Sequence, residues 1–128
     1  MDIISKFASA ITDSGIRCGY EFPRKYGFDV KKGEITAFAG IKSITLNRLR
    51  DGLADISAAV RVTVQAFGSD GESILSAAEK KVVPAVMKCG EEIYSAVISE
   101  VMYDGKSDRV YCEIIFEVRR GGCDICDG

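Results

Sequence analysis

Apolar residues recur at intervals of three and four along the first stretch of the chain. They share one face of a helix, and they are Ile3, Ile4, Phe7, Ala8 and Ile11. Gly15 follows as a typical helix stop. The pattern therefore predicts a short amphipathic helix over residues 2–13.

From residue 16 the apolar period changes to two, the period of a half-buried strand. Residues 16–22 alternate in this way, and Pro23 ends the run or places it at a sheet edge. The following residues, 24–33, are basic and contain glycine. We expect a short strand over 16–22 and then a loop.

Two runs rich in β-branched residues come next, over residues 34–46 and 56–68. Between them lies Asp51-Gly52, a pair typical of tight turns. Gly40 interrupts the first run, as a bulge or kink would. These features predict a long antiparallel hairpin with a prominent tip.

A second helix is indicated after residue 68. Ser69 followed by Glu72 fits a capping box. An apolar stripe at helical spacing follows, made of Ile74, Leu75, Ala78, Val82 and Val83. Pro84 should kink or interrupt this helix, whose last turn extends toward Gly90.

The last part of the chain predicts another hairpin. Residues 92–103 and 109–118 are strand-like, and the turn between them contains Asp104-Gly105. The remaining residues, 119–128, have no periodicity and are expected to form an extension outside the regular structure.

The predicted order is helix, three strands, helix and two strands. Strands joined by turns favour an α+β fold, here a mainly antiparallel sheet of about five strands with two helices packed on it. We expect a single domain over residues 1–118, followed by the C-terminal extension 119–128.

Composition narrows the function classes. The chain has 128 residues, a net charge of −2 and no histidine. The missing histidine removes the commonest general base and the commonest metal ligand. No apolar run is long enough to span a bilayer, and the N-terminus lacks the pattern of a signal peptide. We therefore expect a cytoplasmic protein without a membrane partner, and the missing histidine disfavours an enzyme without excluding one.

The five cysteines hold the only motif that suggests thiol or metal chemistry, Cys123-x-x-Cys126. Redox pairs need a site that stabilises the thiolate, whereas here aspartates flank the thiols. A structural zinc site needs four ligands, and the chain offers no second pair. A metal site shared between chains and a simple polar tail both stay open. Cys18, Cys89 and Cys112 lie among apolar neighbours and are predicted to fill the core.

The acidic and basic residues form no recognisable catalytic or binding motif in the sequence. Glu91 and Glu92 would point to opposite faces of a strand, and Asp104 and Asp108 suit a turn. The basic residues gather in the first loop, in the hairpin tip and after the last strand. Nucleic-acid binding would need them on one face, and the net charge is negative, so we expect no sequence-specific nucleic acid.

The arrangement resembles the tail terminator (tail completion) proteins of long-tailed bacteriophages and of phage-tail-like bacteriocin particles. The resemblance covers residues 1–118. It lies in a short helix, a strand ending in proline ("IRCGYEFP"), a long hairpin, the helix "GESILSAAEKKVVPAV" and a final hairpin. The aspartate-bearing turn and aromatic strand "YDGKSDRVYCEIIFEV" are its most characteristic part.

The resemblance implies a structural protein of a virion or phage-tail-like particle, assembled in the bacterial cytoplasm, that is not an enzyme and needs no cofactor. Such subunits form a hexameric ring on the tail tube and can contact sheath or neck proteins. A ring needs different patches on its two sides, and we expect them at exposed hairpin tips, loops and sheet edges. The candidate interface residues are Arg48, Leu49, Arg50, Asp51 and Leu53 in the tip 47–55; Tyr26, Lys31 and Lys32 in the first loop; and Arg119, Arg120, Cys123 and Cys126 in the extension.

Other functions stay open from the sequence. A head–tail connector or neck subunit would also be a small ring-forming protein. A ligand-binding α+β domain would need convergent polar groups in an apolar cavity. A metal-dependent module would centre on Cys123 and Cys126. A glycine-rich terminus is ordered only where something holds it, so we expect the extension to contact another subunit or, failing that, its own domain.

Overall fold

The computed structural model describes residues 2–21, 30–48 and 53–124. Its helical elements are α1 (Ile3–Asp13), α2 (Gly71–Ala77), the π-helical η2 (Ala78–Val82) and α3 (Val83–Met87). Its strands are β1 (Arg17–Tyr20), β2 (Thr36–Arg48), β3 (Leu53–Phe67), β4 (Glu92–Ile98), β5 (Met102–Asp104) and β6 (Arg109–Asp124).

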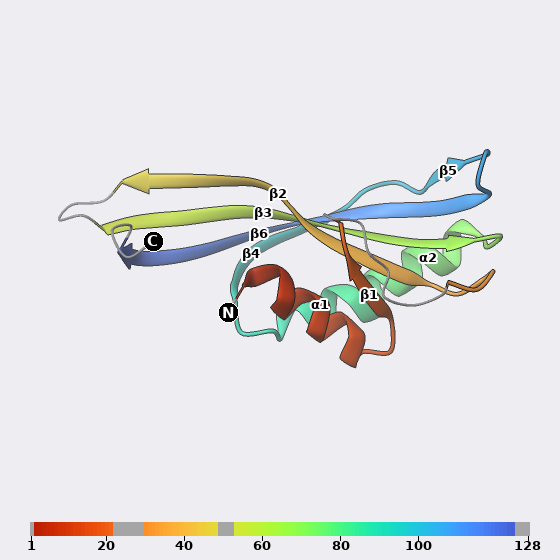
Figure 1. Ribbon diagram of the computed structural model, residues 1–128, viewed down its shortest axis with the longest axis horizontal. Coiled ribbons are helices and arrows are strands. Elements are labelled where there is room, and N and C mark those ends of the chain that lie inside the picture. Colours follow the sequence, from red (N-terminus) through yellow and green to blue (C-terminus); the bar gives the residue numbers. More distant parts are fainter. Residues whose placement is uncertain (1, 22–29, 49–52, 125–128) are drawn as a thin grey trace.

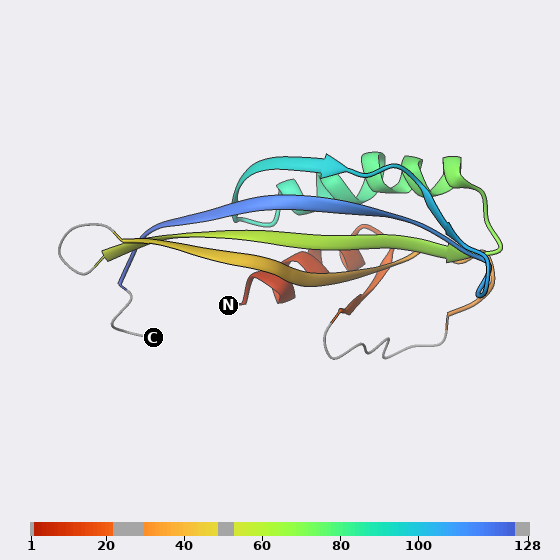
Figure 2. The ribbon, with the colours of Figure 1, turned by 90° about the horizontal axis from the view of Figure 1, so that it is seen from above.

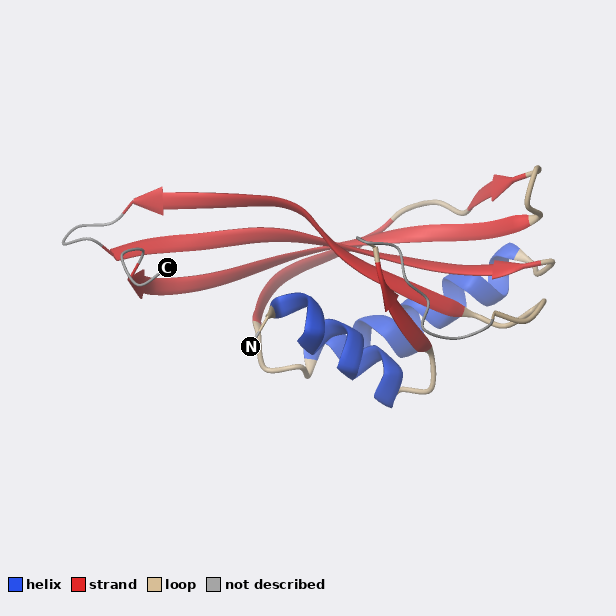
Figure 3. Cartoon of the chain, viewed as in Figure 1, coloured by secondary structure: helices blue, strands red, loops and turns tan. Residues whose placement is uncertain are grey.

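The described strands form one six-stranded sheet in the order β1-β2-β3-β6-β4, with β5 also paired to β6 (Figure 1). All pairs are antiparallel except β1 with β2, which is parallel. The helices cover one face of this sheet (Figure 3). The predicted α+β class is confirmed, with a mixed sheet and one more short strand than expected.

Helix α1 confirms the N-terminal prediction. The Asp2 side chain caps it by accepting a hydrogen bond from the Ile4 N–H at 3.1 Å. Its buried face carries Phe7 and Ile11, which are fully enclosed. The helix therefore forms because its 3.6-residue apolar stripe is buried on the sheet.

The second helical segment begins one residue later than predicted. Asp70, not Ser69, is the N-cap, and its carboxylate accepts from the Ser73 N–H at 2.8 Å. The predicted interruption at Pro84 takes the form of the π-helical turn η2 directly before it. Proline has no N–H and its ring crowds the carbonyl four residues back, so the preceding turn widens while the chain stays helical.

The long hairpin β2–β3 confirms its prediction and extends further than expected. Pairing continues to Arg48 opposite Ala54, so part of the predicted turn belongs to the strands. The register shifts between Ile41 and Ser43, two residues beyond the predicted irregularity at Gly40. The inward alternation on β3 holds as predicted, with Ala58, Val60, Val62, Val64 and Ala66 all buried.

The C-terminal half departs from prediction at two places. The predicted strand 92–103 divides into β4 and β5, which pair with different parts of β6. The expectation that residues 119–128 lie outside regular structure is wrong for 119–124, which continue β6 and pair with β3. Gly121 and Gly122 lower the strand propensity of this stretch. Pairing with β3 outweighs that local preference, because strand formation depends on the neighbouring strand as well as on the residues themselves.

The sheet consists of two regions. In the body, the helices pack on the strands and enclose a core in which Phe7 meets Phe116 edge to face, with ring centroids 5.3 Å apart. Beyond the helices, three strands continue as an arm, defined here as residues 43–48, 53–58 and 119–124 (Figure 2). No helix lies over the arm in either view (Figures 1 and 2).

Candidate assembly surfaces

The candidate residues of the hairpin tip lie at the outer end of the arm. Arg48 is the last residue of β2, and Leu53 is the first of β3. Leu49, Arg50 and Asp51 lie outside the described residues. The tip is narrower than the predicted segment 47–55 because Asn47 pairs with Asp55.

The described residues of the first loop lie at the other end of the sheet. Lys31 and Lys32 are exposed, and the Lys32 side chain packs against the backbone at Gly68, just after β3. Tyr26 lies outside the described residues. Since β3 runs the length of the sheet from Leu53 to Phe67, the structure does not bring the first loop and the tip together.

Glu34 holds this loop to the body. Its carboxylate accepts hydrogen bonds from Arg17 at 2.6 and 2.7 Å and from the Lys31 N–H at 3.2 Å. The Arg17 hydrogen bonds and then the Lys31 N–H lower the pKa of Glu34. The loop end next to β2 is therefore held by charge-assisted hydrogen bonds.

Arg119 and Arg120 both have partners within the chain. Arg119 donates to Asp55 and to the Tyr94 hydroxyl, each at 2.7 Å. Arg120 forms an ion pair with Glu91. These side chains brace the base of the arm against β3 and β4, a structural role that the sequence did not predict.

Glu91 is the meeting point of two elements that are distant in sequence. Its side chain is only 5% exposed and forms ion pairs with Arg120 and with Lys6 of α1, whose Nζ lies 3.1 Å away. Hydrogen bonding from Arg120, and then from Lys6, lowers the pKa of Glu91. This carboxylate therefore links the body helix to the strand that continues into the arm.

Of the two cysteines in the terminal C-x-x-C motif, the structure describes only Cys123. Cys123 belongs to β6 and lies opposite Ala54 of β3. Cys126 lies outside the described residues. For residues 119–124 the structure shows the second of the two expected contacts, with their own domain through strand pairing, while a contact with another subunit stays a prediction. Within the described part of the chain, no three metal-ligating side chains gather into a site.

The three remaining cysteines are part of the body, as predicted. Cys112 is buried in the core, while Cys18 and Cys89 pack against it. Burial raises the pKa of Cys18 to about 12 and that of Cys112 to about 11. Such thiols are protonated at neutral pH and suit packing more than nucleophilic chemistry.

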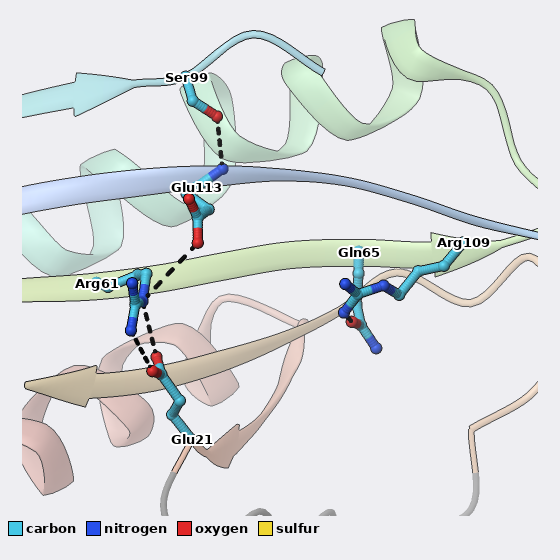
Figure 4. A network of polar contacts seen from close by, with 6 residues as sticks. All are labelled: Glu21, Arg61, Gln65, Ser99, Arg109 and Glu113. Carbon is cyan, nitrogen blue, oxygen red and sulfur yellow. Dashed lines mark hydrogen bonds and ion pairs between the residues drawn. The ribbon is translucent and has the colours of Figure 1, made fainter. Parts of the chain in front are cut away.

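A polar network lies on the sheet face opposite the helices (Figure 4). Arg61 on β3 donates two hydrogen bonds to Glu21 and lies 3.8 Å from Glu113 on β6. Hydrogen bonding to Glu21 raises the pKa of Arg61. A second contact joins Arg109 to the buried Gln65 at 2.8 Å.

This network borders a cavity of about 350 Å³ that also includes Phe38 and Tyr111 in its lining. Arg109 stacks on the Tyr111 ring at 4.1 Å. The charged groups are paired with one another across β3 and β6, so they stabilise the arrangement of strands on this face. Sequence reasoning missed the network because its members alternate with core residues on three separate segments.

Sequence reasoning also missed the exposed apolar side chains. Four of the five most exposed in the described chain lie on β2 and β4, and the fifth is Tyr103 on β5. On β2, Ile44 is 59% exposed and Leu46 is 62% exposed. On β4, Tyr94 is 54% exposed and Val97 is 63% exposed. The sequence predicted strands here, but only the strand pairing shows that β4 is an outer strand and that β1 covers β2 no further than Ala39.

The fold and these surfaces define an α+β protein with a mixed sheet and a protruding three-stranded arm. No helix within the described ranges is long and apolar enough to cross a membrane. No known family model matches the chain, and no curated protein matches it.

Proposed function

We propose that this chain is a structural subunit that forms a ring and terminates or caps the tail tube of a bacteriophage or phage-tail-like particle. The order of its elements resembles that of tail terminator proteins. The observation that carries the proposal is the combination of this order with the arm, a three-stranded projection bearing exposed Ile44 and Leu46.

The physical argument concerns how a ring closes. Each subunit of a cyclic ring presents one patch to the copy before it and a different patch to the copy after it. The chain has suitable surfaces at two separate edges of its sheet, near Leu46 on β2 and near Val97 on β4. Its end surfaces, at the arm tip and at the Lys31–Lys32 loop, then stay available for tube, sheath or neck proteins.

A test measures tail-tube length in the presence of the purified protein and the tube subunit of the same particle. We expect rings at one end of each tube, seen by negative-stain electron microscopy, and a narrower length distribution. Tubes that grow to the same lengths with bare ends would contradict the proposal. Rings that bind head connectors but not tubes would assign the protein to the neck instead.

The tip is tested with Arg48→Glu together with Arg50→Glu. We expect fewer capped tubes, because the charge facing the tube would be reversed. The matched control is Lys80→Glu with Lys81→Glu, which makes the same charge change on exposed positions of η2. Equal capping by both double variants would exclude the tip from the tube contact.

A further inference from the structure

From the two edges of the sheet we infer a specific contact between copies of this chain. We propose that the outer edge of β2, residues 41–48, pairs with the outer edge of β4 in a second copy, so that the sheet continues across the subunit boundary. The inference deepens the proposed ring and rests on that proposal only for ring closure.

The first observation is that neither edge has a partner among the described strands. β1 pairs with β2 only from Thr36 to Ala39, so in the described chain no strand covers β2 from Ile41 to Arg48. β4 is the last strand on the other side of the sheet. Open strand edges present backbone N–H and C=O groups in a row and readily accept another strand.

The second observation is an apolar stripe on β2 that a bulge keeps on one face. Ile41 lies opposite Val60, and Ile44 lies opposite Ala58, both of which are buried on the helix side. A regular strand would send side chains three residues apart to opposite faces. The register shift between Ile41 and Ser43 restores them to the same face. Leu46 continues the stripe.

The third observation is a matching stripe on β4. Ile93, Ala96 and Ile98 lie opposite Val118, Phe116 and Ile114, whose side chains are buried on the helix side. They are only partly buried themselves. In a sheet that continues from β2 of one copy to β4 of the next, the helix-side stripes of both strands become neighbours.

The fourth observation is charge complementarity. The β2 segment "GIKSITLNR" carries Lys42 and Arg48 and no acid, whereas "EEIYSAVISE", which contains β4, carries acids and no base. Glu91 is occupied within the chain, but Glu92 and Glu100 are exposed. The bases lie near the two ends of one edge and the acids near the two ends of the other, so either strand direction can pair them.

These observations select a second copy as the occupant of each edge. A β2–β2 contact would place bases opposite bases, and a β4–β4 contact would place acids opposite acids, which is unfavourable in either case. The β2–β4 contact joins different patches, so it repeats from copy to copy and forms a ring where the rotation between successive copies closes.

The experiment blocks one edge at a time. Ile44→Lys with Leu46→Lys blocks β2, and Glu92→Lys with Val97→Lys blocks β4, because lysine on an edge strand opposes pairing. All four positions are exposed, so the subunit fold should be unchanged by circular dichroism. Leu75→Lys with Met87→Lys is the control, since both residues are exposed on helices.

Native mass spectrometry then reads the outcome. We expect the wild type and the control to form the same oligomer, and each blocked variant to be monomeric. An equimolar mixture of the two blocked variants should give a one-to-one dimer and nothing larger, because only one functional β2 edge and one functional β4 edge remain. A dimer from either blocked variant alone, a mixture that stays monomeric or a monomeric wild type would overturn the inference.

The result is independent of the tube experiment. If both blocked variants keep the wild-type mass and still arrest tube growth, the edge contact is wrong while the proposed function stands. If the mixture forms the expected dimer but wild-type rings never limit tube length, the edge contact stands and the proposed function fails.

Discussion

The body and the arm contain the same three strands, β2, β3 and β6, in different surroundings. In the body one face is sealed by helices, and residues such as Val62 and Ile114 have no exposed surface. In the arm the corresponding face has no helix over it, and Ile44 and Leu46 are exposed. The arm segments are poorer in β-branched and apolar residues than the same strands in the body, so the sequence and the helix cover together divide the strands into a core and a surface.

The comparison shows that apolar residues on this sheet serve two purposes. Those under the helices stabilise the subunit by removing apolar surface from water. Those in the arm gain little from folding, because they stay exposed in the isolated subunit. Their burial in an assembled particle would supply the same driving force to association.

The largest effect is expected from truncating the centre of the body. Phe116→Ala should lower the free energy of unfolding by about 3–5 kcal/mol, since it removes a buried ring and leaves a cavity beside Phe7. Leu46→Ala in the arm should change it by less than about 0.5 kcal/mol. Urea unfolding followed by circular dichroism measures both, and similar losses would contradict the division into body and arm.

A smaller effect is expected at the junction of the two regions. In Gly40→Ala the new Cβ would lie 2.6 Å from the Cβ of Glu21, close to the backbone, so the strands must shift. We expect a loss of about 1–3 kcal/mol in unfolding free energy and a weaker contact between Glu21 and Arg61. Gly105→Ala is the control, because its Cβ would meet Tyr103 at an ordinary 3.6 Å.

The smallest of these effects concerns the ion pairs that link body and arm. Glu91→Gln should cost about 1–2 kcal/mol at pH 7, between the values typical of exposed and of buried pairs, because Glu91 is buried while Lys6 and Arg120 are about a third exposed. The measurement is urea unfolding as a function of pH.

The pH dependence has a definite sign. The pKa of Glu91 is lowered in the folded state, so its contribution is present above the unfolded pKa of about 4.3 and is lost as pH falls through the folded pKa. The wild type should therefore approach Glu91→Gln in stability on acidification below about pH 4. A difference between them that stays constant down to pH 2 would show that Glu91 acts through packing instead of charge.

Periodicity was sufficient to predict much of the fold. The stripe around Phe7 gave α1, the alternation from Ala58 to Ala66 gave the inner face of β3, and Asp104-Gly105 marked the final turn. Each of these signals is local, since it arises from residues within one element. The N-cap of α2 was displaced by one residue because Ser69 and Asp70 are both good caps, and only the backbone geometry chooses between them.

The candidate surfaces were less predictable. Arg119 and Arg120 were predicted to be interface residues because they are charged and follow the last predicted strand. In the structure they form ion pairs within the chain, with Asp55 and Glu91. The apolar residues of the arm were assigned to a strand without any indication that they lie at an edge. No pattern within β2 or β4 reports its position in the sheet, because that depends on which strands pair across long sequence separations.

The sequence by itself determined the α+β class, the long hairpin and the buried stripes, because periodicity and turn residues act over a few positions. Tertiary structure alone decided that residues 119–124 continue β6, that Glu91 joins Lys6 to Arg120, and that β4 and the part of β2 from Ile41 onward lie at open edges of the described sheet. The physical reason is that each of these depends on pairing between segments far apart in the chain. A strand's propensity shows that it will pair, while the partner is chosen by the packing of the whole sheet.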